Sequence, residues 1–313
     1  MNKETNKGFN KVITALDHSG SFRVYLAITT KMVEEARKIH NTTPLATAAL
    51  GRVLTGAGLM GLLLKRDEDK LTLLFKGDGP AEQILATANG DGKVKGYIAN
   101  PYVDLPKKPN GKLDVGGAIG IGTLTVISDL GMKQPYVGKI DLVSGEIAED
   151  LTAYYFISEQ RNTSVALGVK IDTDLSVAAS GGMIIQMLPN PEPKAIDALE
   201  EMIEKIPSLT ALIEEEIQKS QGKTEEAIME GLLDSIFKDL PQEFKVNPLE
   251  FRDIGWECDC SEERLEQVVI SIGKKDLTEI IEEDGQAELV CQFCSSKYFF
   301  DKEHLLKLLE ETV

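Results

Sequence analysis

Cys258-Asp259-Cys260 and Cys291-Gln292-Phe293-Cys294 contain all four cysteines of this 313-residue chain, and thirty residues separate the two motifs. Two close cysteine pairs with an insert of this size between them can surround one zinc ion with a tetrahedron of thiolates. Iron–sulfur ligation fits less well, because C-x-C is not the spacing that such clusters use. The sequence therefore predicts a small domain that binds one zinc ion through Cys258, Cys260, Cys291 and Cys294.

The spacing of the cysteines alone favours a purely structural zinc module over a regulatory one. A module of roughly 70 residues has a thin core, and structural zinc supplies on the order of 10–16 kcal/mol to folding. Thiolates are also the form of cysteine that oxidants attack, and oxidation to a disulfide removes the ligands. A disulfide between Cys258 and Cys260 would close a small strained ring, and strained disulfides are readily reduced. An oxidation switch is thus physically natural, while a structural role stays open.

Working outward from the cysteines, we expect a zinc-binding domain over residues 241–313. Capping residues predict helices that begin after Ser261, Asp276 and Asp301. Apolar alternation predicts strands at 287–290 and 296–300, on either side of the second cysteine pair. One cysteine pair is then expected at a strand-to-helix junction and the other in a hairpin turn.

Residues 191–240 are expected to form an amphipathic helical linker, which follows the breaker cluster Pro189-Asn190-Pro191-Glu192-Pro193. The apolar stripes are Ile196, Leu199, Ile203 and Ile206; then Leu209, Leu212, Ile213 and Ile217; then Ile228, Leu232, Leu233, Ile236 and Phe237. Helices of about 12–15 residues are marginal in isolation. These stripes therefore need an apolar surface to rest on, and a small helical subdomain is the alternative.

Residues 1–190 are expected to form one mixed α/β core domain with β-sheets and few helices, so the fold class is α+β. Helices are predicted at 31–40 and 45–64, and a short one at 81–88. Strands are predicted at 22–28, 71–76, 93–98, 120–127, 136–142, 164–171 and 182–188. The run Gly56-Ala57-Gly58-Leu59-Met60-Gly61 has dinucleotide-site spacing but no preceding strand, so we interpret it as part of a buried helix.

Composition and charge weigh against several classes of function. The net charge is −17, with about +1 in residues 1–190 and about −18 in residues 191–313, and such acidity repels nucleic acid. The first residues lack the apolar stretch of a secretory signal, and ligand thiols at metal spacing suit a reducing cytoplasm. No membrane segment is expected. His18, His40 and His304 are interpreted as structural or surface residues, and the absence of a catalytic constellation predicts that the chain is not an enzyme.

The chain resembles the 33 kDa chaperonin family, the redox-regulated heat-shock holdases of bacteria. Cys258-Asp259-Cys260-Ser261 together with Cys291-Gln292-Phe293-Cys294 is similar to the zinc signature of that family. Core-domain motifs of the family are matched by Gly77-Asp78-Gly79-Pro80, by Gly96-Tyr97-Ile98-Ala99-Asn100-Pro101, by Tyr154-Tyr155-Phe156-Ile157-Ser158-Glu159-Gln160 and by Gly181-Gly182-Met183-Ile184-Ile185-Gln186-Met187-Leu188-Pro189. The resemblance covers nearly the whole chain.

This resemblance implies a chaperone that holds unfolding client proteins without ATP and prevents their aggregation under oxidative stress. It implies a reduced, zinc-loaded monomer of low activity. Oxidation is expected to pair Cys258 with Cys260 and Cys291 with Cys294, release zinc, unfold the zinc domain and linker, and yield an active homodimer. The core domain would then bind clients and carry the dimer contact.

Other classes of function remain as rivals. A thiol–disulfide oxidoreductase using Cys291 and Cys294 is the alternative from the enzyme class, although no thioredoxin-like βαβ pattern surrounds Cys291. A zinc-ribbon module that binds nucleic acid is a third possibility, which the acidic C-terminal half disfavours.

Overall fold

The computed structural model describes residues 8–219 and 222–311, and these divide into two compact units. The first unit runs to Trp256 and the second begins at Glu257. We expected domain boundaries at 190 and 240. The structure instead keeps residues 191–256 with the first unit, because the linker helices pack on its sheet and strand β10 (Val246–Arg252) pairs with strand β1 (Asn10–Asp17).

One antiparallel sheet of the first unit carries the linker. Its strand order is β10, β1, β2 (Phe22–Thr29), β9 (Val177–Met187) and β8 (Thr163–Ile171). The chain leaves this sheet at the end of β9 and returns to it as β10, on the far side of β1 and β2. Asp17 fixes the β1–β2 turn by accepting hydrogen bonds from the N–H groups of Ser19 and Phe22, at 2.9 and 2.7 Å.

A second sheet of this unit has the strand order β11 (Gly255–Trp256), β5 (Lys93–Ile98), β4 (Gln83–Asn89), β3 (Lys70–Gly77), β6 (Gly122–Asp129) and β7 (Tyr136–Asp141). The short helix expected at 81–88 is wrong, because residues 83–89 form β4 between β3 and β5. Ile84, Ala86 and Ala88 are buried while their neighbours are half-buried, so the burial period is that of a strand.

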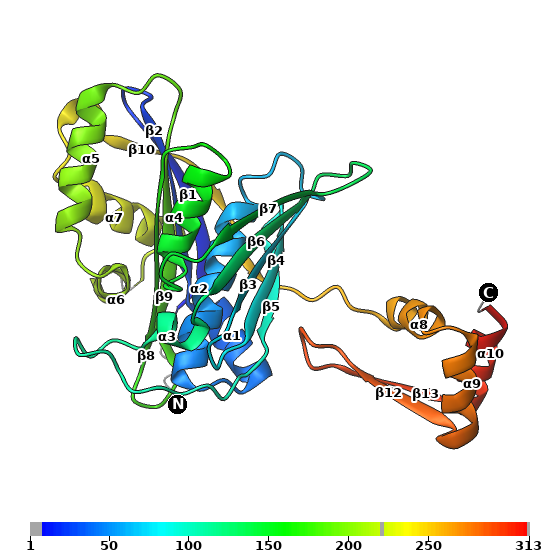
Figure 1. Cartoon of the computed structure of the whole chain (residues 1–313). Coiled ribbons are helices and arrows are strands. Elements are labelled where there is room, and N and C mark those ends of the chain that lie inside the picture. Colours follow the sequence, from blue (N-terminus) through cyan, green and yellow to red (C-terminus); the bar gives the residue numbers. More distant parts are fainter. Residues whose placement is uncertain (1–7, 220–221, 312–313) are drawn as a thin grey trace. The chain divides into compact units, whose positions relative to one another are not determined.

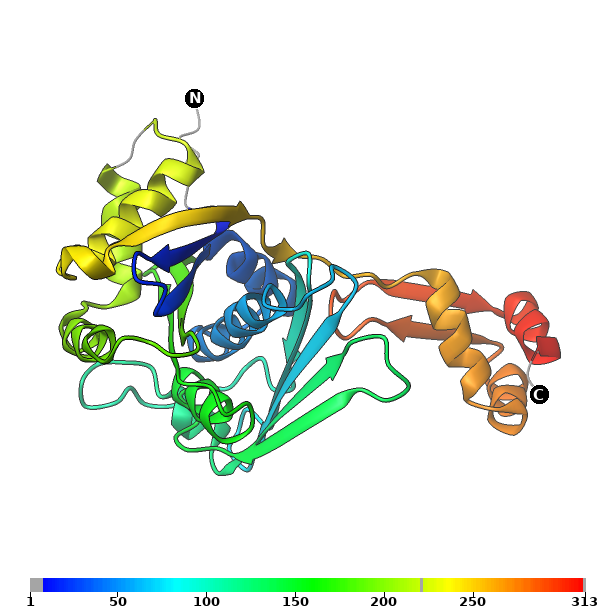
Figure 2. The ribbon, with the colours of Figure 1, turned by 90° about the horizontal axis from the view of Figure 1, so that it is seen from above.

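Helices α1 (Thr30–His40) and α2 (Pro44–Gly61) lie between the two sheets, as Figure 1 and Figure 2 show. Nearly every side chain of α2 is buried. A Cβ atom at Gly58 would lie 2.4 Å from Ile254 Cδ1, and one at Gly61 would lie 2.8 Å from the Asn89 carbonyl. The glycines therefore allow close packing, which confirms the buried-helix interpretation. Shorter helices α3 (Val115–Ile119) and α4 (Ala148–Ile157) complete this layer.

The linker helices α5 (Pro193–Lys205), α6 (Leu209–Lys219) and α7 (Glu225–Phe237) cover the other face of the first sheet (Figure 1). A 3-10 turn at Gln242–Phe244 then leads into β10. The stripe predicted for α7 is buried throughout. In α5 the stripe is wrong at Ile203, which is 37% exposed. Leu199 of the predicted stripe is buried as expected, and it is joined on the buried face by Ala195 and Met202, which were not predicted.

The second unit contains α8 (Glu262–Ser271), α9 (Lys274–Glu283), the hairpin β12 (Gln286–Val290) and β13 (Lys297–Asp301), and α10 (Lys302–Glu311). Ser261 caps α8 and Asp301 accepts a hydrogen bond from the His304 N–H, as expected. The cap predicted at Asp276 is wrong, since α9 begins one turn earlier, after Gly273 with φ of +95°. These elements and the sheets confirm the α+β class.

Candidate metal centre

The structure brings the sulfur atoms of the four cysteines together within the second unit. Cys258 and Cys260 lie in the extended segment before α8, and Cys291 and Cys294 lie in the turn that joins β12 to β13. The four ligand atoms all lie within 4.8 Å of one another. Cys258 Sγ is 3.8 Å from Cys291 Sγ, and Cys260 Sγ is 3.3 Å from Cys294 Sγ. Tetrahedral Zn–S bonds of about 2.3 Å would separate sulfur atoms by about 3.8 Å.

The hairpin turn that carries the second pair has a compact backbone. The Ser295 N–H donates to the Cys291 carbonyl at 2.8 Å, and the Cys291 N–H donates to the Ser296 carbonyl at 2.9 Å. Ser295 adopts φ of +59°, in the left-handed region. This turn points both Cys291 and Cys294 toward the same spot, as a C-x-x-C metal ligand pair requires.

Polar side chains surround the sulfur atoms. The Tyr298 hydroxyl on β13 donates to Cys260 Sγ at 3.2 Å, and Cys294 Sγ lies 3.2 Å from Ser296 Oγ with a hydrogen bond between them. On the other pair, the Arg264 guanidinium donates to the carbonyl oxygen of Asp259 at 2.9 Å. The contact from Tyr298 was not predicted; the signal available in the sequence is its place on a strand four residues after Cys294.

The environments of the thiols push their pKa values apart. Burial raises the pKa of Cys258 and of Cys260. Burial also raises the pKa of Cys294, but hydrogen bonds with Ser296, Cys260 and Cys291 together outweigh it and lower that pKa to about 6. The bond to Cys260 raises the pKa of Tyr298 to about 12. The cluster thus favours negative charge at one sulfur before any cation is bound.

The donor set fits zinc. Four cysteine sulfurs could form a complete tetrahedral shell for a borderline-soft ion, which would need no further ligand. Two of the three histidines take structural contacts instead: His40 Nε2 lies 3.0 Å from the Gly96 carbonyl, and His304 Nε2 lies 2.8 Å from Glu266 Oε1. His18 is exposed. His304, Glu262 and Glu266 also lie within 4.8 Å of one another, and this contact ties α10 to α8.

The surroundings of Cys291 and Cys294 differ from those of a thioredoxin-type site. Both residues sit in an antiparallel hairpin, whereas such a redox pair stands near a βαβ unit. Within the described residues, no helix has the length and apolar character needed to cross a bilayer.

Comparisons with known proteins agree with one another. The family model described as Hsp33 protein matches residues 10–301. A 33 kDa chaperonin of Alkaliphilus oremlandii is 47% identical over 303 residues, which cover 96% of this chain and 97% of the relative. A 33 kDa chaperonin of Clostridioides difficile is 46% identical over 301 residues, with 96% and 98% covered. The crystal structure of a 33 kDa chaperonin (heat shock protein 33 homolog) from Thermotoga maritima superposes with a TM-score of 0.83 at 34% identity, covering 96% of this chain and 98% of the other.

Proposed function

Because this chain belongs to the Hsp33 family of 33 kDa chaperonins, we propose that it is a redox-regulated, ATP-independent holdase whose cysteine cluster is the switch. The chaperone class follows from the family, and the relatives carry the name chaperonin. The regulation by oxidation, the zinc ion and the residues of the switch are the proposal. The proposed ligands of one zinc ion are Cys258, Cys260, Cys291 and Cys294 in their thiolate form.

The proposed chemical step is oxidation of these thiolates by a peroxide. Two thiolates lose two electrons as one S–S bond forms, and one hydrogen peroxide molecule accepts these electrons and two protons to become two water molecules. By the family resemblance, the pairs formed are Cys258–Cys260 and Cys291–Cys294. Sulfurs that have joined in disulfides no longer bind the cation as thiolates. Mass mapping of the oxidised chain should find these pairs; bridges from 258 to 291 or from 260 to 294 would contradict the pairing.

The fold of the second unit explains why losing the ligands should unfold it. Its buried apolar core is small. The buried members are Val269, Leu277, Ile281, Phe300, Leu305 and Leu308. A structural zinc site contributes on the order of 10–16 kcal/mol to folding. A core of this size supplies less folding free energy than that. We therefore infer that metal binding and folding of residues 257–311 are one coupled equilibrium.

The linker helices cover the surface that we propose for client binding. Beneath α5, α6 and α7, the sheet presents a continuous apolar face. That face includes Ile13, Ala15, Phe22, Val24, Leu26, Ile28, Met183 and Ile185. When the helices are docked, these side chains are at most 4% exposed. Undocking would expose a large apolar patch, which is the kind of surface that binds unfolding proteins.

Lys11 offers a physical connection between the switch and the linker. Its ammonium group contacts Glu226 at the start of α7 at 3.2 Å and Asp253 at 2.8 Å, and only 14% of the side chain is exposed. The hydrogen bond that the Lys11 ammonium donates to the Asp253 carboxylate raises the pKa of Lys11. Asp253 lies five residues before Cys258. We propose that disorder spreading from Cys258 toward Asp253 weakens this contact and with it the docking of α7.

The observation that carries the proposal is the placement of the four thiols in a unit with a thin core. The test is to follow zinc release with a chromophoric chelator and suppression of client aggregation by light scattering during peroxide treatment with mild heating. Both signals should rise together, and added reductant plus zinc should reverse them. Suppression that stays at its reduced level after all zinc has left would overturn the proposal.

Two further features belong to this proposal. We propose that the oxidised form is a homodimer, which sedimentation of reduced and oxidised protein would test. We also propose a cytoplasmic location, because four ligand thiols need a reducing compartment.

The insulin reduction assay separates the rival enzyme function from the proposed one. An oxidoreductase would reduce insulin with many turnovers, while a holdase would not reduce it and would suppress aggregation in proportion to the amount of chaperone added.

A further inference from the structure

An open pocket of about 490 Å³ lies between the core of the first unit and the first turn of α6. Its walls come from the N-terminal part of α2, the loop around 107–113, strand β8 and residues 208–210. A volume of this size holds a small molecule. The residues that line the pocket include none of the four cysteines and none of the residues named above for the apolar face beneath the linker, so neither feature uses it.

The charged side chains that line the pocket are mostly cationic. Arg52, Lys107, Lys112 and Lys170 stand against the single carboxylate Asp172. Lys170 is paired with Glu214 on α6 at 2.6 Å. Among the described residues, the exposed ammonium groups of Lys107 and Lys112 make no ion pair. The pocket therefore has positive charge that its own walls leave uncompensated.

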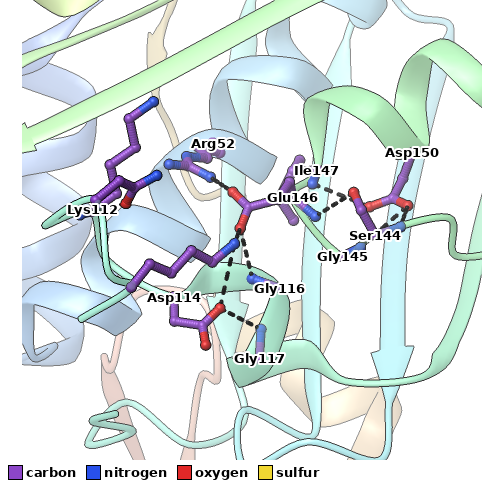
Figure 3. A network of polar contacts seen from close by, with 12 residues as sticks. Arg52, Lys112, Asp114, Gly116, Gly117, Ser144, Gly145, Glu146, Ile147 and Asp150 are labelled. Carbon is purple, nitrogen blue, oxygen red and sulfur yellow. Dashed lines mark hydrogen bonds and ion pairs between the residues drawn. The ribbon is translucent and has the colours of Figure 1, made fainter. Parts of the chain in front are cut away.

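Arg52 is held in place by the polar network drawn in Figure 3. Its Nη1 donates to Glu146 Oε2 at 2.7 Å, and the other carboxylate oxygen of Glu146 accepts from Lys108 and from the Gly116 N–H at 3.2 Å. Burial raises the pKa of Glu146, but these bonds outweigh burial and lower it. Nε of Arg52 is buried, so a ligand in the open pocket cannot reach it. Among the described residues the guanidinium donates only through Nη1, which leaves Nη2 as the donor available to a ligand.

The loop that carries Glu146 is itself rigidly built. The buried carboxylate of Asp150 accepts hydrogen bonds from the N–H groups of Val143, Ser144 and Gly145 and, through its second oxygen, of Ile147. These bonds hold Ile147 at φ of +66°, which a β-branched residue rarely adopts. Figure 3 shows Asp150 facing this loop and Glu146 facing Arg52. The guanidinium is therefore positioned before any ligand arrives.

The first turn of α6 adds donors on the opposite wall. Ser208 and Thr210 both line the pocket, with their hydroxyl oxygens 2.9 Å apart. Helix N-termini, hydroxyls and cationic side chains together are the groups that bind phosphate oxygens. An anionic ligand that only accepts hydrogen bonds suits the pocket better than a neutral ligand, because the cationic and hydroxyl donors in its walls outnumber the single carboxylate, Asp172.

We propose that this pocket binds an oligophosphate, either a free phosphate chain or the phosphates of a nucleotide. Such a ligand bridges Lys107, Lys112 and Arg52 of the core to the first turn of α6. A molecule that binds only while α6 is docked stabilises the docked linker by mass action. The consequence for regulation rests on the proposed function, whereas the binding itself does not.

Calorimetric titration of the reduced, zinc-loaded full chain with tripolyphosphate, in low salt, tests the binding. The double variant Lys107→Gln/Lys112→Gln should bind at least tenfold more weakly than the parent. Lys65→Gln/Lys133→Gln removes the same charge from exposed sites outside the pocket and should change the affinity less than twofold. Equal losses in the two variants, or no saturable binding by the parent, overturn the proposal. Matching thermal unfolding of both variants excludes misfolding as the cause.

A second titration with ATP separates the two sources of phosphate. Equal affinity for ATP and tripolyphosphate identifies the phosphate chain as the recognised group, and tighter binding of ATP identifies a nucleotide. Hydrogen exchange then tests the consequence: saturating tripolyphosphate should slow exchange of α6 amides severalfold in the parent and leave α2 unchanged. Unchanged exchange in α6 with intact binding refutes the link to the linker but not the redox switch, which the zinc-release experiment tests separately.

Discussion

Leu232 in the middle of α7 offers a direct test of linker docking. Its side chain is fully buried in the apolar cluster formed by the linker helices and the sheet. Leu→Ala at such positions costs about 2–5 kcal/mol, since the cavity left behind adds to the lost transfer energy. If docking of the linker carries that cost, the docked-to-undocked ratio should fall roughly 30-fold to several-thousand-fold, at 1.36 kcal/mol per factor of ten.

Hydrogen exchange of the reduced, zinc-loaded protein measures this ratio, because amides in α7 exchange when the helix opens. Leu232→Ala should lower protection in α7 by at least the 30-fold lower bound and leave α2 unchanged. The same variant should suppress client aggregation without any oxidant. Ile203→Ala, at an exposed position of α5, is the matched control and should change protection by about twofold or less. Lost protection in α7 with no gain in chaperone activity would refute the idea that the docked linker hides the client surface.

Further predictions concern the metal, its surroundings and pH. Chelation under reducing conditions should remove the circular-dichroism signal of α8, α9 and α10 while amides in 8–190 stay protected; protected α8 amides in the metal-free chain would contradict coupled folding. Tyr298→Phe removes the bond to Cys260 and should weaken metal binding about tenfold in chelator competition, whereas Tyr136→Phe on β7 should not. Glu146→Gln should cost about 2 kcal/mol in urea unfolding at neutral pH. Because the folded pKa of Glu146 is lowered, this difference should be full above the unfolded pKa of 4.5 and vanish as pH falls through the folded pKa; a constant difference would contradict the assignment.

Regular periodicity in the sequence predicted most elements of the fold, and strand context explains the failures. Residues 81–88 contain alanines, which are compatible with a helix. Residues 83–89 nevertheless form β4, because they pair with β3 on one side and β5 on the other. Strand β10 was not predicted because Pro248 and the charged residues around it hide its alternation, while pairing with β1 needs only its backbone. In α5, the large side chains of Ile196 and Ile203 led to a predicted face that is shifted by one residue from the buried one. The structure buries Ala195 against the sheet, and a small side chain gives little signal in the sequence.

The four residues of the candidate site could be predicted from the spacing of the cysteines, because each motif contains two ligands that are close together in the chain. Their meeting in space depends on the β12–β13 hairpin and the helices between the motifs, which the sequence also indicated. Tyr298 and Ser296 escaped prediction because a hydrogen bond to sulfur requires a particular direction of the side chain. The pocket beside Arg52 escaped for a similar reason: its walls come from segments far apart in the chain.

The return of the chain to the first sheet through β10 has a consequence for reversibility. The segment between β9 and β10 is anchored at both ends to strands of one sheet, with β1 and β2 between the anchors. Strand spacing puts those anchors roughly 14 Å apart. When the linker helices detach, the segment is therefore a loop that is held at both ends. Its redocking on the sheet is an intramolecular step, and the helices have a high effective concentration near the sheet. Redocking of the linker should accordingly proceed at a rate that dilution does not alter when zinc and reductant are held constant, once the clients have left.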